Sequence, residues 1–192
     1  LKDFTKIKNI EAGMDQIWFY SSILISFMLI NPNKNTIRSI QKHLGIIEIT
    51  GDDAGVQTIS IQEEQPIKKQ PIPKVLEASV KQLKEYIEGS RTTFTFLINP
   101  KGTEFQKQVW NILLTIPFGK TLPYIEVAQI YGNTKAVRAV AAAIGKNPIL
   151  VAVPCHRVIG SDGSLVGFAS GLDKKKWLLE KEGFPFQTEI PF

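Results

Sequence analysis

The chain divides near residue 99 into two parts with different local patterns, and this division restricts the folds that are open to it. Before it, two β-branched runs, 46–50 and 56–61, flank the turn-forming segment 51–55, which is typical of a β-hairpin. After it, apolar residues recur at helical spacing. The sequence therefore predicts a mixed α/β protein, with a small sheet first and mainly helices afterwards.

The first half is predicted to add a helix and a further strand to this hairpin. Residues 63–73 form a charged, proline-containing linker, and Gly89 ends a predicted amphipathic helix over 74–88. The apolar face of this helix consists of Leu76, Val80, Leu83 and Ile87. Residues 94–98 alternate apolar and polar side chains, which predicts a half-buried strand. Because this half contains no candidate catalytic set, we interpret it as a scaffold.

The second half begins with a predicted helix that is followed by a helix pair. Thr103 and Gln106 have the spacing of a capping box, and Pro117 ends the helix that follows them. Two short helices are predicted over 123–130 and 134–144, joined by a turn that contains a glycine. This arrangement is the signature of a helix-turn-helix, although many such pairs are purely structural.

The second helix of this pair has an outer face of small and basic residues. Its apolar side consists of Val137, Val140, Ala141 and Ile144. Its outer face consists of Lys135, Arg138, Ala139 and Ala142. A helix with its side chains is ~10–12 Å across and a DNA minor groove is about 6 Å wide, so alanines would let the helix approach a groove closely. Alanine is also the best helix former, so the pattern favours DNA binding without proving it.

The net charge of +5 is concentrated in one segment. Residues 119–176 contain eight basic and three acidic side chains, which accounts for the whole excess. A basic surface suits a polyanionic partner such as DNA. A lysine-rich face that only keeps the protein soluble is the ordinary alternative.

Cys155 is the only cysteine of the chain, so no disulfide can form within it. A single cysteine fits a reducing compartment, and we expect a cytoplasmic protein. One cysteine and two distant histidines also leave no ligand set for a structural zinc, so no metal site is predicted.

The surroundings of Cys155 leave two roles open for it. The apolar run 149–153 predicts a short buried strand, and Pro154 fixes one backbone dihedral before the thiol. An ordinary thiol with a pKa near ~8.5 is only a few per cent ionised at neutral pH, so a nucleophile needs a base such as the adjacent His156. Neighbouring strand residues point to opposite faces, so this pair can cooperate only on a turn or a helix start. The alternative role is that of a small buried hydrophobe.

The residues after the cysteine predict a loop and a last helix. Residues 161–163 form a tight turn within a glycine-rich loop, and Asp173 is predicted to cap the helix that follows. Trp177 and Leu178 are expected to pack inward. Glu182 lies at the C-terminal end of this helix, where the dipole disfavours an anion, which suggests a cationic or hydrogen-bonding partner. An exposed glutamate is the alternative.

The first 40 residues are the least informative part of the chain. The apolar run 17–30 is shorter than the ~20 residues that cross a bilayer, so no membrane partner is expected. Acidic residues precede this run and no Ala-x-Ala site follows it, which argues against a signal peptide. A strand-forming extension and a segment upstream of the true start both remain open.

Several motifs in register resemble those of the O6-alkylguanine-DNA alkyltransferases, the methylated-DNA–protein-cysteine methyltransferases. They are Asn147-Pro148, the stretch Pro154-Cys155-His156-Arg157-Val158, the glycine-rich loop, and residues 177–183. The resemblance runs without a gap from Gly102 to Gly183 and more loosely back to Leu44. It implies a ribonuclease H-like N-terminal domain and a mainly helical C-terminal domain with a helix-turn-helix. The predicted boundaries are 1–40 for an extension, 41–98 for the scaffold domain, 99–184 for the DNA-binding and alkyl-transfer domain, and 185–192 for a tail.

The resemblance also implies a reaction and its residues. Glu182 orients His156, which takes the proton of Cys155 through a water, and the thiolate removes the alkyl group from O6-alkylguanine or O4-alkylthymine. The cysteine is not regenerated, so each molecule acts once and needs no cofactor. Asn147 braces the cysteine turn, and the hydroxyl of Tyr124 stabilises charge on the guanine ring.

The partner implied by the resemblance is double-stranded DNA, bound by a monomer at the minor groove with the damaged nucleotide flipped out. Arg138 fills the space that this nucleotide leaves. The residues expected to contact DNA are Arg138, Lys135, Ala139, Ala142, Tyr124 and Arg157. The residues expected to line the substrate pocket are Val158, Ile144, Leu150, Gly167, Phe168, Ala169 and Ser170, with the Ala169 amide near the guanine oxygen.

The chain departs from the family pattern at a few positions of this site. Leu150 replaces a proline, Phe168 a tyrosine and Ser170 a glycine, and alanines stand at 141 and 142 where glycines are usual. These changes bear on the size of the pocket and on the alkyl group it prefers. Two other classes are weighed against repair: a protein that recognises alkylated bases without repairing them, whose known examples lack the cysteine, and a cysteine hydrolase, which explains neither the helix pair nor the location of the charge.

Overall fold

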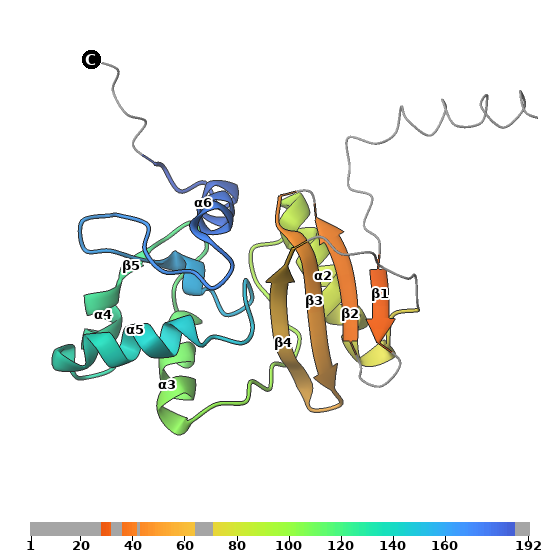
Figure 1. The fold of residues 1–192 in the computed structure, drawn as a ribbon, viewed down its shortest axis with the longest axis horizontal. Helices are drawn as coiled ribbons and strands as arrows, with labels where there is room; N and C mark the ends of the chain where they lie inside the picture. The colour runs from red at the N-terminus through yellow and green to blue at the C-terminus, as the bar shows by residue number, and fades with distance from the viewer. Residues whose placement is uncertain (1–27, 32–35, 42, 64–70, 187–192) are drawn as a thin grey trace, which may run out of the picture.

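The structure is a computed structural model that describes residues 28–31, 36–41, 43–63 and 71–186. A β-sheet with helix α2 lies on one side of the molecule, and the remaining helices lie on the other (Figure 1). The fold is therefore mixed α/β, as the apolar spacing predicts. No helix within these four ranges is long and apolar enough to cross a membrane.

The sheet has four antiparallel strands in the order β1-β2-β3-β4. Strands β3 (Gly45–Asp52) and β4 (Gly55–Gln62) form the predicted hairpin, with Ile47 opposite Ile61 and Ile49 opposite Ile59. Strands β1 (Met28–Asn31) and β2 (Thr36–Gln41) precede them. The segment 1–40, whose status the sequence left open, therefore contributes strands to this sheet. Residues 1–27 lie outside the described part of the chain.

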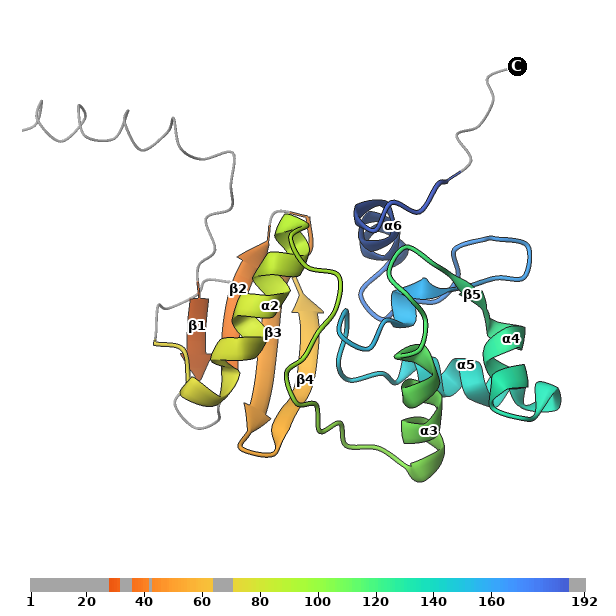
Figure 2. The same cartoon turned by 180° about the vertical axis from the view of Figure 1, so that it is seen from behind.

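Helix α2 covers one face of this sheet (Figure 2). The 3₁₀ turn η2 (Lys74–Leu76) leads into α2 (Glu77–Glu88), and Gly89 ends the helix in the left-handed conformation, with φ +86°. The helix buries Val80, Leu83, Tyr86 and Ile87 on its inner side. Burying one large apolar side chain contributes about 1.5–3 kcal/mol, so this face holds the helix on the sheet.

The outer edge of β4 joins the two parts of the molecule. Val56 donates a backbone hydrogen bond to Leu97 and accepts one from Asn99, so the linker between the two parts runs along this edge. Further along, Ile59 donates to Pro148, and Leu150 donates back to Ile59. The edge is thus paired by chain from the second part and is covered at both points.

The two short strands that the sequence predicts at 94–98 and 149–153 do not form. Residues 94–98 form only a single bridge, at Ile98, and the side chain of Gln82 takes the backbone N–H of Thr95 at 2.8 Å. The run 149–153 forms only a bridge at Ile149 and then turns, with φ +71° at Val151. In each case the apolar pattern reports burial rather than strand pairing.

The second part consists of short helices around one core. Helix α3 (Glu104–Leu113) starts with the predicted capping box, in which Thr103 and Gln106 bond each other's backbone N–H at 2.9 and 3.3 Å. It ends before Pro117. The predicted pair follows as α4 (Tyr124–Ile130), the 3₁₀ turn η3 (Thr134–Ala136) and α5 (Val137–Gly145). Trp110 of α3 donates its indole N–H to Ala143 of α5 at 2.9 Å, which fixes these helices together.

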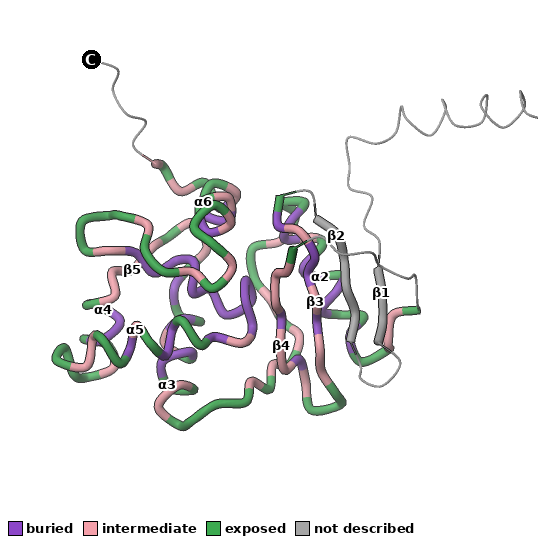
Figure 3. Tube along the Cα trace, in the orientation of Figure 1, coloured by how far each residue is buried: buried purple, intermediate pink, exposed green. Residues whose placement is uncertain are grey.

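The remaining elements surround the cysteine. Short strands β5 (Leu122–Pro123) and β6 (Val158–Ile159) pair in parallel, and the 3₁₀ turn η4 (Cys155–Arg157) leads into β6. Helix α6 (Leu172–Lys181) closes the fold. The predicted cap is wrong, because Gly171 is the N-cap of α6 and Asp173 already lies in its first turn. Residues 149–159 are all buried, and Figure 3 shows this stretch inside the second part.

Candidate active site

Cys155 begins the turn η4 and is only 4% exposed. Asn147 holds the preceding chain, because its Nδ2 donates to the Val153 carbonyl at 2.8 Å and its Oδ1 accepts from the N–H of Ile149 at 3.0 Å. The same Nδ2 lies 3.1 Å from the sulfur of Cys155. One amide side chain therefore shapes the turn and contacts the thiol, which fits the bracing role expected of Asn147.

The turn places Cys155 and His156 in succession on one short helical segment. A strand would send their side chains to opposite faces, and this turn does not. His156 is fully buried, and its Nε2 lies 2.8 Å from Oε1 of Glu182. Its Nδ1 is the one buried side-chain nitrogen or oxygen, among the residues the structure describes, that has no hydrogen-bond partner. A nitrogen in that state keeps a lone pair available for a proton.

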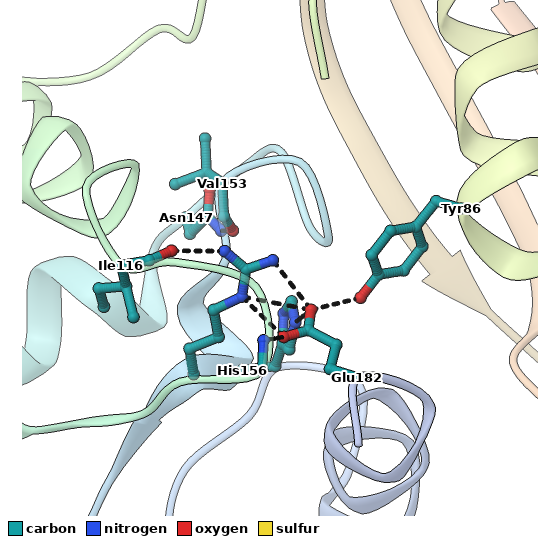
Figure 4. A network of polar contacts seen from close by, with 8 residues as sticks. Tyr86, Ile116, Asn147, Val153, His156 and Glu182 are labelled. Atoms are coloured by element: carbon teal, nitrogen blue, oxygen red, sulfur yellow. Dashed lines mark hydrogen bonds and ion pairs between the residues drawn. The ribbon is translucent and has the colours of Figure 1, made fainter. Parts of the chain in front are cut away.

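Glu182 is buried at the end of α6 and collects several donors, as Figure 4 shows. Its Oε1 accepts from the hydroxyl of Tyr86 at 2.6 Å, and its Oε2 accepts from the N–H of Gly119 at 3.0 Å. Arg157 donates to both oxygens, at 2.9 to 3.2 Å. The helix end disfavours a bare anion, and these partners compensate for that.

The prediction that Arg157 contacts DNA is wrong. Arg157 is 6% exposed, and its guanidinium is held by Glu182 and by the carbonyl of Ile116. A buried guanidinium held by these two partners is not placed at the surface, where a phosphate would bind. Arg157 instead neutralises the buried carboxylate, because an unpaired buried charge is costly.

Burial sets the proton affinities of the site. It raises the pKa of the Cys155 thiol to about 11, against the opposing hydrogen bond from Asn147 and the charge of Lys175. Burial also lowers the pKa of His156, although Glu182 acts in the other direction. The pKa of Glu182 falls to about 2 because hydrogen bonds from His156 and Arg157 outweigh its burial. The resting site thus contains a neutral thiol, a neutral imidazole and a carboxylate.

Lys175 is a buried cation of the site that the sequence analysis missed. From α6, its Nζ donates to the carbonyls of Val158, Val166 and Gly167 at 2.5 to 3.2 Å. Burial lowers the pKa of Lys175 to about 8, although nearby Cys155 raises it. The ammonium thereby ties the glycine-rich loop to strand β6 beside the thiol.

A pocket of about 490 Å³ lies between this loop and helices α4 and α5. Its lining includes four of the predicted residues, Tyr124, Gly167, Phe168 and Ala169, together with Ala141, Gly145 and Val166. The Tyr124 hydroxyl donates to the Val166 carbonyl at 3.2 Å. The pKa of Tyr124 is raised by burial and by nearby Cys155.

The other predicted pocket residues lie elsewhere. Val158, Ile144 and Leu150 are buried in the core, where they support the site from behind. Ser170 is half-buried, and its hydroxyl lies 3.4 Å from the carbonyl of Ile61. The departures at Leu150 and Ser170 are therefore not on the pocket surface, whereas Phe168 is.

Helix α5 presents the outer face that its sequence predicts. Lys135, Arg138, Ala139 and Ala142 are all exposed, whereas Val140, Ala143 and Ile144 are buried. The pocket opens beside this helix, because Ala141 and Gly145 belong to its lining. A large partner that contacts this face would also reach the pocket.

Three contributors to the site could not be found from their own surroundings in the sequence. Tyr86 looks like one more apolar position of α2, and Gly119 acts through its backbone. Lys175 stands in a run of three lysines, and only its position one turn from Leu178 and Leu179 suggests an inward direction.

Comparison with known proteins identifies the class to which this fold and site belong. The family model for the DNA-binding domain of 6-O-methylguanine DNA methyltransferase matches residues 104–184. The crystal structure of Mycobacterium tuberculosis OGT in complex with DNA superposes with a TM-score of 0.67 at 39% identity, over 74% of this chain and 89% of that one. An O6-methylguanine DNA methyltransferase from Methanococcus jannaschii gives a TM-score of 0.56 at 28% identity, over 80% and 95% of the two chains. The class is that of the alkyltransferases that act on DNA through a protein cysteine.

The sequence relatives specify the family within this class. A methylated-DNA–protein-cysteine methyltransferase of Methanosarcina acetivorans is 43% identical over 147 residues, which is 73% of this chain and 93% of the relative. One of Mycobacterium bovis is 39% identical over 149 residues, or 76% and 90% of the two chains. This chain belongs to the methylated-DNA–protein-cysteine methyltransferase family.

Proposed function

We propose that this protein repairs DNA by transferring the alkyl group of O6-alkylguanine, and of O4-alkylthymine, to Cys155, once per molecule. The observation that carries the proposal is the buried turn on which Cys155 precedes His156, with His156 bonded to Glu182 at 2.8 Å. The names of the relatives support the same reaction. No cofactor takes part in it.

The chemistry is a single displacement. The sulfur of Cys155 forms a bond to the alkyl carbon while the bond between that carbon and guanine O6 breaks, and its electron pair stays on guanine. The thiol proton passes through a water to Nδ1 of His156, which later releases it to solvent. The freed base takes up one proton from solvent, so thiol and alkylated base become thioether and base with no net change in protons. With a pKa of about 11, the thiol is almost wholly protonated at neutral pH, so base assistance is needed during the reaction. A thioether is a poor leaving group, so the cysteine is not restored.

The pocket beside α5 is proposed to hold the flipped base. Phe168 and Ala169 form part of its wall, and the Ala169 N–H would face the guanine oxygen. The hydroxyl of Tyr124 would leave its carbonyl partner and donate to the ring, where negative charge develops. Asn147 keeps the sulfur in place from the other side.

The helix pair α4 and α5 is proposed to act as a helix-turn-helix at the minor groove. The exposed alanines 139 and 142 let α5 approach the groove, and Lys135 lies near the phosphates. Arg138 enters the stack where the nucleotide has left, which offsets a flipping cost of a few kcal/mol. The protein binds as a monomer, and its lone thiol fits the reducing cytoplasm.

The domain organisation is also a proposal. The sheet and α2 form a ribonuclease H-like scaffold domain that starts with strand β1 rather than at residue 41. Residues 99–184 form the DNA-binding and alkyl-transfer domain.

The Cys155→Ala variant tests the function by separating binding from chemistry. It removes the nucleophile but no DNA contact, so it should bind a duplex containing O6-methylguanine with the affinity of the wild type and gain no label from it. Wild-type protein that binds this duplex and never gains the label would indicate a recognition protein instead. Repeated release of labelled product would indicate a hydrolase.

A further inference from the structure

The half of the chain without a candidate catalytic set provides one polar group to the site. Tyr86, on the inner side of α2, is 1% exposed, and its hydroxyl donates to Oε1 of Glu182 at 2.6 Å. The two residues are 96 positions apart in the sequence. Figure 4 shows Tyr86 reaching across from α2 to the carboxylate at the end of α6.

The oxygen that Tyr86 contacts is the one that faces the histidine. Oε1 accepts from Tyr86 and lies 2.8 Å from Nε2 of His156, and it also accepts from Arg157. Oε2 accepts from Gly119 and Arg157. Of these donors, only Tyr86 comes from the part of the molecule that contains the sheet.

The ring of Tyr86 is held as firmly as its hydroxyl. It packs against Phe94 at 5.3 Å and edge-on against Phe118 at 6.1 Å between centroids. Buried tyrosines usually find some partner for their hydroxyl, so a purely structural bond is the ordinary explanation. What distinguishes this bond is that its acceptor atom also bonds the histidine beside the nucleophile.

We propose that Tyr86 is a positioning residue for alkyl transfer, because its hydroxyl fixes the rotamer of Glu182 and takes up part of the charge that Glu182 presents to His156. This inference rests on the proposed function, since it concerns the rate of that reaction. The part that contains the sheet and α2 is then a component of the catalytic apparatus and not only its support.

The electrostatic consequence has a definite direction. The charged groups that act on His156 are Glu182, Arg157 and Lys175, with Tyr86 acting through Glu182. The pKa of Tyr86 is raised well above its ordinary value by burial and by Glu182, so the phenol remains a donor. Without this donor the carboxylate attracts a proton on His156 more strongly, so the pKa of His156 rises. The base then becomes protonated, and inactive, at a higher pH.

The test compares two variants of α2 that each remove one buried hydroxyl. Tyr86→Phe keeps the ring contacts and removes the bond to Glu182. Ser79→Ala removes a bond to the Leu76 carbonyl, 2.8 Å long, on the same helix. Single-turnover transfer from an O6-methylguanine duplex is measured against pH for both, together with DNA affinity and stability.

Tyr86→Phe removes one hydrogen bond, and the net free energy that such a bond usually contributes sets the size of both effects. Transfer should slow by about 3–10-fold, and the midpoint of the acid decline should rise by about 0.5–1 pH unit. The DNA affinity of this variant should stay at the wild-type value. Ser79→Ala should lose stability but keep the wild-type rate and midpoint. If Tyr86→Phe changes stability alone, as Ser79→Ala does, the inference is wrong. Tyr86→Phe should also add nothing in a Glu182→Gln background, and a full additional loss there would overturn the inference too.

A second measurement needs neither alkyl transfer nor a variant. The chain has two histidines, so the imidazole signals of wild-type protein can be followed by NMR through a pH titration. The hydroxyl proton of Tyr86 should be protected from exchange and should shift as His156 titrates. A Tyr86 signal that ignores this titration contradicts the inference even if repair is confirmed. Wild-type protein without transfer but with the coupled titration would instead refute the proposed function alone.

Discussion

Glu182 has two tasks at the scale of single residues, because one carboxylate orients His156 and also neutralises Arg157. The family resemblance implies the first task, whereas the pairing with Arg157 is not predicted from the sequence. Because Glu182 bonds both residues, we expect a change at this position to alter the stability of the protein as well as the geometry of the site. A test of the relay has to separate the two effects.

Glu182→Gln should slow alkyl transfer by about 10²–10⁴-fold, the usual contribution of general-base assistance, with DNA affinity unchanged. It should also lower the free energy of unfolding by about 3–5 kcal/mol, because Arg157 is left as an unpaired buried charge. The matched control is Glu180→Gln on the same helix, whose half-exposed carboxylate lies 3.9 Å from Lys176. Single-turnover rates and denaturant unfolding measure both effects.

Arg157→Met in the Glu182→Gln background separates the effect on stability from the effect on the transfer rate. It removes the unpaired charge, so it should recover stability without recovering transfer. If transfer returns with stability, the slow rate of Glu182→Gln comes from misfolding and the relay is not supported. A wild-type rate for Glu182→Gln alone would mean that the carboxylate has no role in the reaction.

At the scale of elements, helix α5 is expected to extrude the damaged base. Arg138→Ala should reduce the transfer rate on duplex DNA much more than on the free alkylated base, because only the duplex requires a nucleotide to leave the stack. Lys81→Ala is the charge-matched control, since Lys81 is exposed on α2, in the sheet-bearing part. Rates on the two substrates measure the effect, and equal losses on both would contradict the role of Arg138.

The elements also show what a sequence pattern can predict. The hairpin, α2, the capping box of α3 and the α4–α5 pair rest on local signals, and the structure confirms them. The strands at 94–98 and 149–153 fail because side chains of Gln82 and Asn147 take the backbone groups that a ladder would use. Whether a side chain bonds a backbone group in place of a neighbouring strand depends on residues that are distant in sequence, or on a turn that no sequence pattern predicts.

The residues of the site also divide into those that the sequence predicts and those that it does not. The thiol, its adjacent base and the glutamate are predicted from motif residues, and the structure brings His156 and Glu182 together. The contact of Tyr86 follows only from packing between the two parts of the molecule, and the inward orientation of Arg157 follows only from its partners Glu182 and Ile116 within the second part. The sequence therefore identifies the reacting groups and Asn147, but not the other groups that hold them.

At the scale of the whole molecule, the buried cluster predicts how stability depends on pH. The folded state lowers the pKa of Glu182 from 4.5 to about 2, so its contribution is complete above about pH 4.5 and is lost as pH falls toward 2. At most about 3 kcal/mol of the free energy of unfolding depends on the ionisation of Glu182. The lowered pKa of His156 also makes stability fall as pH falls, but at a higher pH than Glu182 does. The reason is that the unfolded chain takes up the histidine proton before the folded protein does.

Denaturant unfolding across the acid range measures this dependence. Glu182→Gln should flatten the loss between about pH 4.5 and 2, whereas Glu180→Gln, an exposed carboxylate on the same helix, should keep the wild-type slope. Identical slopes for the wild type and Glu182→Gln would mean that this carboxylate is not held in its charged form by the fold.

The central claim, one irreversible transfer to Cys155, is tested most directly by mass spectrometry of the intact protein after incubation with excess O6-methylguanine duplex. The thioether cannot leave and the chain has no second thiol, so each molecule should gain one methyl group and stop. Peptide fragmentation should place that group on Cys155, and the amount of repaired guanine should equal the amount of protein. More repaired guanine than protein, or a methyl group on another residue, would contradict the claim.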